Sequence, residues 1–299
     1  MSWLITLFLA GVMFTSDASI GNQYNYVNSD APRSSKQDET ERFEQSYPLN
    51  PNGRVSVSNV NGSVTVRAWD RNEVKLIAVK TADSRETLAE VEIKVDSRPD
   101  YLRVETDYQN WKRRNGGEGW RENRKLTVEY NLMVPRTAVL NEVETVNGSV
   151  TVSDMVNYTK ISAVNGQVRG TNLSGTAILS TVNGNTEAEF TSLLPTSKIS
   201  LETVNGQASL LIPSDANATV KADTVNGSIN NNFGLPVRKG EYVGRDLYGR
   251  IGTGEAQIKL NSVNGGLTIN RRNDGRNQNP AVNLLPAKSG NTDENWERG

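Results

Sequence analysis

Between Phe43 and Ile269 the chain alternates apolar and polar residues in short runs, and a Val-Asn-Gly motif interrupts these runs seven times. The valines of the motif stand at positions 60, 146, 164, 182, 204, 225 and 263. The five from Val146 to Val225 are spaced 18, 18, 22 and 21 residues apart, which is the regularity of a structural repeat. The last gap is 38 residues, about two periods, so we expect one coil there to lack the motif or to carry an insertion.

The residues around each motif repeat as well. Three residues before the valine the chain is always apolar, at Val57, Val143, Ile161, Leu179, Leu201, Ala222 and Leu260. Four residues after it stand Val64, Val150, Val168, Thr186, Ala208, Ile229 and Leu267. Each unit therefore predicts a strand, a turn and a second strand. Asn-Gly suits a turn because glycine adopts positive φ freely and asparagine tolerates it. The predicted turn residues are Asn61, Gly62, Asn147, Gly148, Asn165, Gly166, Asn183, Gly184, Asn205, Gly206, Asn226, Gly227, Asn264 and Gly265.

Two all-β architectures fit this unit. In a β-hairpin, Asn-Gly forms a two-residue loop between paired strands. In a β-solenoid, Asn-Gly forms a corner, and successive coils of about 20 residues stack about 4.8 Å apart. Only the solenoid gives a reason for a valine before every Asn-Gly, because a corner can turn that valine inward. We therefore favour a single-chain β-solenoid.

The motif spacing also divides the chain. Residues 43–136 hold the first repeat and longer alternating runs, which predict a β-rich cap continuous with the solenoid of residues 137–270. Residues 1–18 contain an apolar run, Trp3 to Phe14, that is too short to span a membrane comfortably, and they end in a small-x-small pattern. This predicts a cleaved signal peptide and no stable membrane span afterwards. Residues 19–42 predict a flexible linker and residues 271–299 a disordered tail, because both are polar and lack apolar periodicity.

Composition narrows the chemistry. The chain has no Cys and no His, which excludes Ser-His-Asp triads, cysteine nucleophiles and His or Cys metal sites. The net charge of −1 gives no general attraction to nucleic acid. The dense Asp-Gly pattern of repeat calcium sites is missing. We accordingly expect no cofactor, no metal and no nucleic-acid partner.

The repeat resembles a known family. The segment from Val57 to Val66 with Trp69 after it, the passage from Val134-Pro135 into Thr145–Val150, and the stretch from Gly252-Thr253-Gly254 to Leu267 are similar to the DUF4097 family of bacterial adhesin-like proteins. The resemblance covers about residues 43–269. It implies a β-solenoid in the periplasm or on the cell surface, and it offers no catalytic residues.

Two segments outside the repeats are candidate binding sites. The loop of residues 107–125 places Tyr108, Trp111 and Trp120 among basic residues that include Arg113 and Arg114, and such aromatic and basic side chains can stack on sugars and pair with acidic groups. The alternative is a hairpin loop whose tryptophans cover the end of the core. Residues 233–255 are glycine-rich but lack the order of a phosphate-binding loop, so we interpret them as a structural excursion.

The function that the sequence favours is therefore an exported, adhesin-like structural or binding module at the cell envelope, whose partner is an unidentified polymer or protein. A carbohydrate-active enzyme on a β-helix scaffold is the alternative, and it would need converging carboxylates. Glu187, Glu189 and Glu202 form the best acidic cluster, with a solvated face as the simpler interpretation. An envelope-stress regulatory partner is a third hypothesis.

Overall fold

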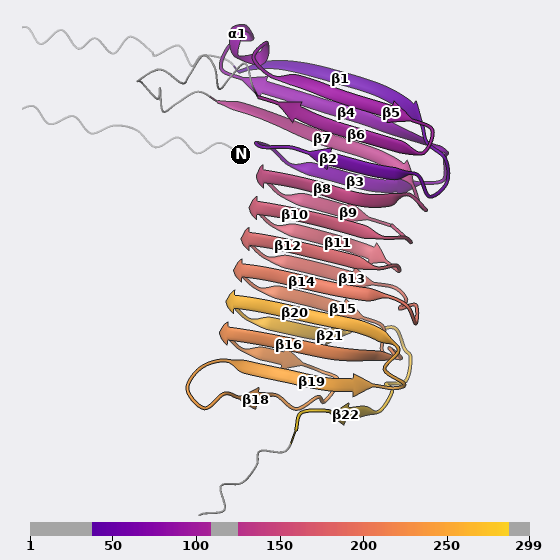
Figure 1. Cartoon of the computed structure of the whole chain (residues 1–299), viewed down its shortest axis with the longest axis vertical. Helices are drawn as coiled ribbons and strands as arrows, with labels where there is room; N and C mark the ends of the chain where they lie inside the picture. The colour runs from indigo at the N-terminus through magenta and orange to yellow at the C-terminus, as the bar shows by residue number, and fades with distance from the viewer. Residues whose placement is uncertain (1–37, 109–124, 287–299) are drawn as a thin grey trace, which may run out of the picture. The chain divides into compact units, whose positions relative to one another are not determined.

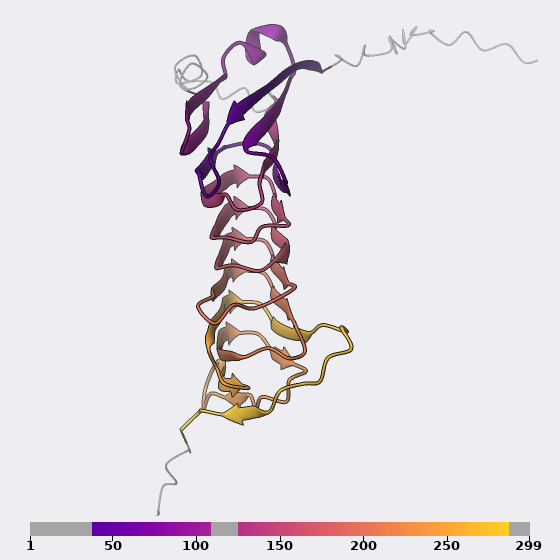
Figure 2. The same cartoon turned by 90° about the vertical axis from the view of Figure 1, so that its right-hand side faces the viewer.

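Two β-sheets lie face to face, and each Asn-Gly corner carries the chain from one sheet to the other (Figures 1 and 2). The computed structural model describes residues 38–108 and 125–286, which belong to the unit Gln37–Gly299. This part of the chain has one four-residue helix, α1 (Arg85–Leu88), and is otherwise strands and connections. The prediction of an all-β fold is confirmed.

The entry sheet holds the strands that lead into the corners. In spatial order it consists of β18 (Arg238–Lys239), β19 (Arg245–Ile251), β16 (Ala218–Asn226), β20 (Ala256–Asn264), β14 (Lys198–Asn205), β12 (Ala177–Asn183), β10 (Thr159–Asn165), β8 (Val139–Asn147), β2 (Arg54–Ser58), β6 (Tyr101–Asp107) and β5 (Glu92–Arg98), with β22 (Ala281–Asn283) paired to β19.

The exit sheet holds the strands that leave the corners. Its spatial order is β1 (Glu39–Pro48), β4 (Glu73–Ala82), β7 (Leu126–Pro135), β3 (Val64–Trp69), β9 (Val150–Ser153), β11 (Val168–Leu173), β13 (Thr186–Phe190), β15 (Ala208–Ile212), β21 (Leu267–Arg271) and β17 (Ile229–Asn231).

Equivalent strands of different repeats pair in parallel and in register. Asn183 of β12, for example, pairs with Asn165 of β10 on one side and with Asn205 of β14 on the other. One entry strand, its corner and one exit strand thus form a rung of a stack. The hairpin alternative is wrong, because the strands on either side of each Asn-Gly lie in different sheets. The apolar residues three before and four after each valine are buried between the sheets.

The rungs do not stack in chain order. The first rung, β2/β3, lies directly against β8/β9, although Asn61 and Asn147 are 86 residues apart. The last rung in the sequence, β20/β21, lies between β14/β15 and β16/β17 (Figure 1). After β17 the chain forms β18 and β19, of which β19 runs antiparallel to β16, and then returns to form β20. This detour accounts for the 38-residue gap between the last two motifs.

The corner glycines are needed because neighbouring rungs approach one another closely. A Cβ added to Gly166 would lie 1.8 Å from the carbonyl oxygen of Gly148, and at Gly265 it would lie 1.7 Å from that of Gly206. Within the described residues none of the corner asparagines has a positive φ. Positive φ is therefore not found at the asparagines, but Gly62, Gly148, Gly184 and Gly206 do adopt it, with φ between 125° and 159°. Steric contact between rungs is a second reason for glycine at the corners.

The described ends of the repeat region are more ordered than the sequence indicates. β1 begins at Glu39, inside the predicted linker of residues 19–42, and pairs along its whole length with β4. The predicted tail of residues 271–299 contains β22, and Arg276 in it forms an ion pair with Asp215 at 3.0 Å. The predicted signal peptide, residues 1–18, lies outside the described residues.

Candidate binding groove

At five of the seven corners the residue just before the valine is a threonine or serine that fixes the corner from inside. Thr203 is 4% exposed, and its Oγ1 donates a hydrogen bond to the carbonyl oxygen of Gly184 in the neighbouring rung at 2.9 Å. The same bond recurs at 2.9–3.1 Å at other corners, from Thr145 to Gly62, Thr181 to Gly166, Thr224 to Gly265 and Ser262 to Gly206. The short hydroxyl side chain therefore belongs to the interior and ties one rung to the next.

Six of the seven corner valines lie outside, so the prediction that they turn inward is wrong for these six, whereas Val60 is partly buried against the core. Because the preceding residue points inward and the strand alternates, the valine points to solvent. Six of these side chains are 37–47% exposed: Val146, Val164, Val182, Val204, Val225 and Val263. We call this set the valine row. The constancy of the valine is the sequence signal for this row. It marks a surface position and not, as the sequence suggests, a core position.

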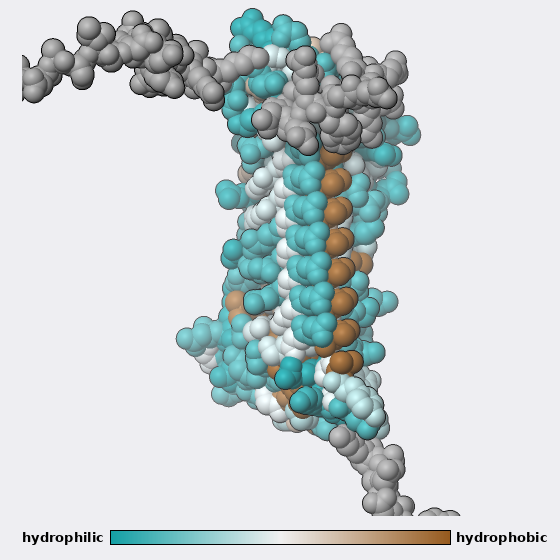
Figure 3. Space-filling model, turned by 90° about the vertical axis from the view of Figure 1, so that its left-hand side faces the viewer, coloured by the Kyte–Doolittle hydropathy of each residue, from teal (hydrophilic) through white to brown (hydrophobic). Residues whose placement is uncertain are grey.

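An asparagine ladder runs beside the valine row. From Asn147 onward, the side-chain amide of each corner asparagine donates to the side-chain oxygen of the preceding one along the stack, at distances of 2.8–3.0 Å. In spatial order the ladder is Asn61, Asn147, Asn165, Asn183, Asn205, Asn264 and Asn226. Figure 3 shows an apolar column and a hydrophilic column side by side along this edge of the stack. The corner therefore presents parallel apolar and amide rows with the repeat of the rungs.

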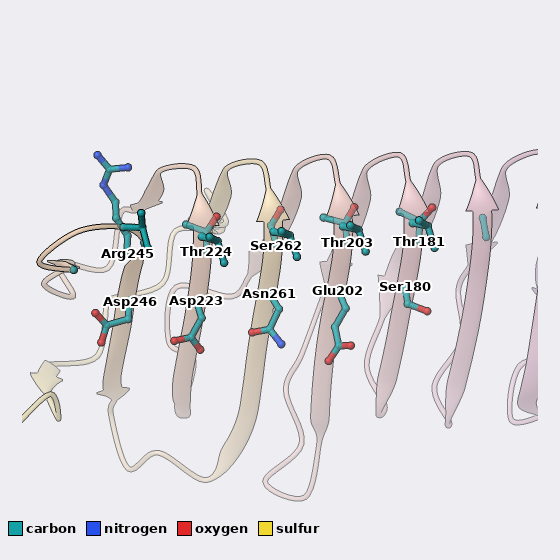
Figure 4. A pocket seen from close by; sticks show the side chains of 18 residues that line it. Ser180, Thr181, Glu202, Thr203, Asp223, Thr224, Arg245, Asp246, Asn261 and Ser262 are labelled. Atoms are coloured by element: carbon teal, nitrogen blue, oxygen red, sulfur yellow. The ribbon is translucent and has the colours of Figure 1, made fainter.

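A groove of about 730 Å³ follows the valine row near the β18–β19 turn. Its apolar wall consists of Val182, Val204, Val263 and Val225. Its floor consists of the outward-facing residues two positions earlier on each strand, which pair directly across the sheet (Figure 4): Ser180, Glu202, Asn261 and Asp223, followed by Asp246 of β19. The β18–β19 turn closes one end with Gly240, Val243, Gly244 and Arg245. The groove thus combines an aliphatic wall with a line of polar groups.

The carboxylates of the floor are held by basic residues that do not line the groove. Glu202 Oε1 lies 3.0 Å from Lys259 Nζ, and this hydrogen bond is the main reason why the pKa of Glu202 is lowered. Asp223 lies 3.9 Å from Lys221, a long ion pair, and Asp246 makes two hydrogen bonds with Arg238 at 2.7 and 3.1 Å. These three basic residues are absent from the lining.

Among the described lining residues the only basic one is Arg245, and its guanidinium donates to the backbone carbonyl of Gly227. The lining therefore has three carboxylates and one cation, and two of the carboxylates, Glu202 and Asp223, flank the amide of Asn261. A ligand in this groove meets methyl groups on one side and acidic oxygens on the other.

Of the five candidate contact residues predicted in the loop of residues 107–125, only Tyr108 lies among the described residues. Trp111, Trp120, Arg113 and Arg114 lie outside the described residues. Tyr108, expected in an exposed loop, is 6% exposed. Its hydroxyl oxygen accepts a long hydrogen bond from the backbone N–H of Asn61 at 3.4 Å, and burial raises its pKa to about 12. Tyr108 is therefore a core residue rather than a contact residue for a ligand.

The acidic cluster considered for an enzyme is separated by the fold. Glu187 and Glu189 lie on β13 in the exit sheet, whereas Glu202 lies on β14 in the entry sheet. Glu187 forms an ion pair with Arg169 at 3.6 Å, and Glu189 forms one with Arg272. The three carboxylates point away from the core on opposite sides of the stack and cannot converge on one substrate.

Residues 38–108 and 125–286 contain neither a metal-ligand cluster nor a membrane-spanning helix. In these ranges no three acidic side chains gather closely enough to hold a metal ion. No helix in the same ranges has the length and apolar character needed to span a bilayer.

The chain is similar to a known family and to several solved structures. The family model described as Toastrack DUF4097 matches residues 28–270. A candidate cell adhesion protein from Clostridium sporogenes is 14% identical, with a TM-score of 0.42, over 78% of this chain and 100% of that one. A candidate lipid binding protein from Parabacteroides distasonis is 11% identical, with a TM-score of 0.27, over 80% of this chain and 98% of that one.

A candidate adhesin from Bacteroides fragilis is 12% identical, with a TM-score of 0.30, over 78% of this chain and 97% of that one. At such low identities and TM-scores we infer nothing about function from these structures. Among proteins with curated descriptions, none matches the sequence.

Proposed function

Because the chain belongs to the Toastrack DUF4097 family, whose model matches residues 28–270, we propose that it is an exported, non-catalytic binding module of the bacterial cell envelope. The observation that supports this proposal is the groove along the valine row. Six valines with about two-fifths of their surface exposed form one continuous row, with a groove of about 730 Å³ beside it. Contiguous apolar patches on soluble proteins are often interaction sites.

The repeat architecture supports a binding role over a purely structural one. At five of the seven corners a hydroxyl residue just before the valine already bonds to the neighbouring rung, so the valine is not needed to hold these corners together. A polar residue at the valine position would suit an exposed corner as well. An apolar residue that stays exposed at six of the seven repeats is therefore better explained by a partner than by folding.

The chemistry of the groove supports a non-catalytic role. A general acid needs a carboxyl whose pKa is raised toward neutrality. Glu202 has a lowered pKa because Lys259 and Ser200 donate to it, so it is ionised and already bonded. Glu187 and Glu189, the other acids of the enzyme hypothesis, are outside the groove.

The test is retention of the purified chain by isolated cell envelopes, measured by sedimentation. We expect Val204→Ser combined with Val263→Ser to lower the retained fraction several-fold. Val156→Ser is the matched control, because Val156 is 37% exposed but lies outside the valine row. Equal retention of all three proteins would overturn the proposal. Trp111→Ala with Trp120→Ala, tested alongside, separates the groove from the aromatic loop as the second proposed contact region.

Export and the absence of catalysis are tested separately. N-terminal sequencing of the protein recovered from the envelope fraction is expected to show cleavage near Ala18. Incubation of the purified chain with envelope polysaccharide is expected to release no reducing ends. Release that disappears in Glu202→Gln would instead establish the enzyme alternative.

A further inference from the structure

We propose that the groove binds lysine side chains of an extended protein segment, with the aliphatic stem against the valine row and the ammonium group on the carboxylates of the floor. This inference rests on the proposed binding function and names the class of its partner. Three features of the described groove lead to it: its width, its charge and the free bonding capacity of its acids.

The width of the groove matches the length of a lysine stem. On each strand the exposed valine and the floor residue are two positions apart, as in Val225 and Asp223 or Val204 and Glu202. Two residues of a strand span about 6.6 Å. The four-carbon stem of lysine covers a comparable distance, and lysine commonly lays this stem on apolar surface while its charged end reaches a polar group. One side chain can therefore contact both rows at once.

The charge of the lining favours a cation. It presents Glu202, Asp223 and Asp246 against Arg245, whose guanidinium is engaged by a backbone carbonyl. Lys221 and Lys259 approach the acids from the side away from the valines, two residues earlier on the strands, and are not part of the lining. A cation arriving from the valine side therefore meets oxygen atoms and not these ammonium groups.

The remaining bonding capacity favours lysine over arginine. Asp246 already makes a two-pronged contact with Arg238, and Glu202 accepts from both Lys259 and Ser200. Asp223 keeps only a long ion pair of 3.9 Å. Arginine is preferred where a carboxylate offers both oxygens to its planar fork, whereas lysine needs a single acceptor. Asp223 is therefore the expected anchor, with Glu202 two rungs away for a second lysine.

A polysaccharide fits these features less well. None of the described lining residues is aromatic, so the groove has no ring on which a sugar could stack. Its apolar wall consists of valine methyl groups, and its polar groups are mainly acidic. We therefore choose a protein segment as the partner and make the glycan an outcome of the test.

The experiment measures binding of a fluorescently labelled peptide of alternating lysine and serine to the full chain by anisotropy. We expect saturable binding that weakens as salt is raised, because the contact is charged and exposed. Asp223→Asn and, separately, Val204→Ser with Val225→Ser should each weaken binding about ten-fold, the loss expected for one charged hydrogen bond or for comparable apolar contact. The matched controls are Glu187→Gln and Val156→Ser, which change a paired acid and an exposed valine away from the groove.

Two altered peptides test the stem and the charge independently. Norleucine in place of lysine keeps the stem without the ammonium, and diaminopropionic acid keeps the ammonium on a short stem. Both are expected to bind at least ten-fold more weakly than the lysine peptide. Equal binding of the diaminopropionic acid peptide would show charge attraction alone and overturn the inference.

Other results distinguish this inference from the proposed function. If the lysine peptide does not bind while valine-row variants still lose envelope retention, the partner assignment is wrong and the binding function stands. If envelope polysaccharide occupies the groove and is not displaced by the peptide, the partner is a glycan and the inference is likewise wrong. If neither retention nor peptide binding depends on the valine row, both are wrong.

Discussion

The close approach of neighbouring rungs can be tested with a single methyl group, by Gly206→Ala. A Cβ at Gly206 would lie 1.8 Å from the carbonyl oxygen of Gly184, whereas real Cβ contacts are essentially never under 3.0 Å. The obstacle is backbone on both sides, so no side chain can rotate away. The two rungs must therefore separate locally by at least 1.2 Å (3.0 minus 1.8), about a quarter of their normal 4.8 Å spacing.

The cost follows from the bonds that cross this gap. The backbone N–H of Gly184 donates to Asn205 at 3.0 Å, Thr203 Oγ1 donates to Gly184 at 2.9 Å, and the Asn205 amide donates to Asn183 at 2.8 Å. Stretching each by about 1 Å loses most of its net value of about 1 kcal/mol. Overpacking, together with the positive φ of 159° that alanine disfavours at this position, adds about 1–3 kcal/mol. We expect Gly206→Ala to destabilise the chain by about 3–5 kcal/mol in total.

The assay is urea unfolding of the full chain followed by circular dichroism, with Gly266→Ala as the matched control. Gly266 follows a corner glycine directly, but a Cβ there would meet Ser228 Oγ at 3.4 Å, an ordinary contact. The control should change the free energy of unfolding by less than about 1 kcal/mol, because it adds no clash and reduces unfolded-state entropy. If Gly206→Ala is no more destabilising than Gly266→Ala, the steric explanation of the corner glycines is refuted.

Further outcomes test the rung order, the corner hydroxyls and the buried phenol. The chain has no native cysteine, so engineered pairs report on neighbouring rungs. Cysteines at positions 205 and 264 should form a disulfide on mild oxidation, whereas cysteines at 205 and 226 should not. Mass spectrometry of the digest identifies the bond, and the reverse result would disprove the rung order. Thr203→Val keeps the shape of the side chain but removes the buried hydroxyl bond, and it should lower the free energy of unfolding in urea by about 1–2 kcal/mol. Thr203→Ser keeps the hydroxyl and should lower it less; equal losses of stability in the two variants would show that the bond does not stabilise the corner.

Raising the pH should destabilise the chain between about pH 10 and 12, because folded Tyr108 keeps its proton to about 12 and the unfolded phenol loses it near 10. The folded state then binds more protons than the unfolded state, so the slope of stability with pH is negative. Tyr108→Phe should flatten this slope in thermal melts, and an unchanged slope would contradict the assignment.

The repeat and the alternation of apolar and polar residues could be read from the sequence, because both depend on residues close together in the chain. A period of about 20 residues and apolar residues every second position are enough to predict an all-β stack with its inward residues, and those residues are buried. The motif also located each corner. The direction of the corner valine could not be read from the sequence, because a corner leaves open whether the alternation of the strand continues through it. In the structure it continues: the residue before the valine is buried, whether it is a hydroxyl residue such as Thr203 or an apolar one such as Ala163.

The groove could not have been predicted, because its parts are distant in the chain and its rung order is not sequential. Asn261 lies between Glu202 and Asp223 only because β20 returns to pair with both β14 and β16. Asp246 joins the line because β19 runs antiparallel beside β16.

Local sequence determined which residues form each rung, through a hydrophobic period that any single repeat already contains. Only the tertiary structure decided which rungs are neighbours. All the corners carry nearly the same motif, so pairing energies between them are similar, and the connections and the antiparallel detour through β19 select one order. The site depends on that selection, because Asn261 and Asp223 reach the groove on rungs whose order in space differs from their order in sequence.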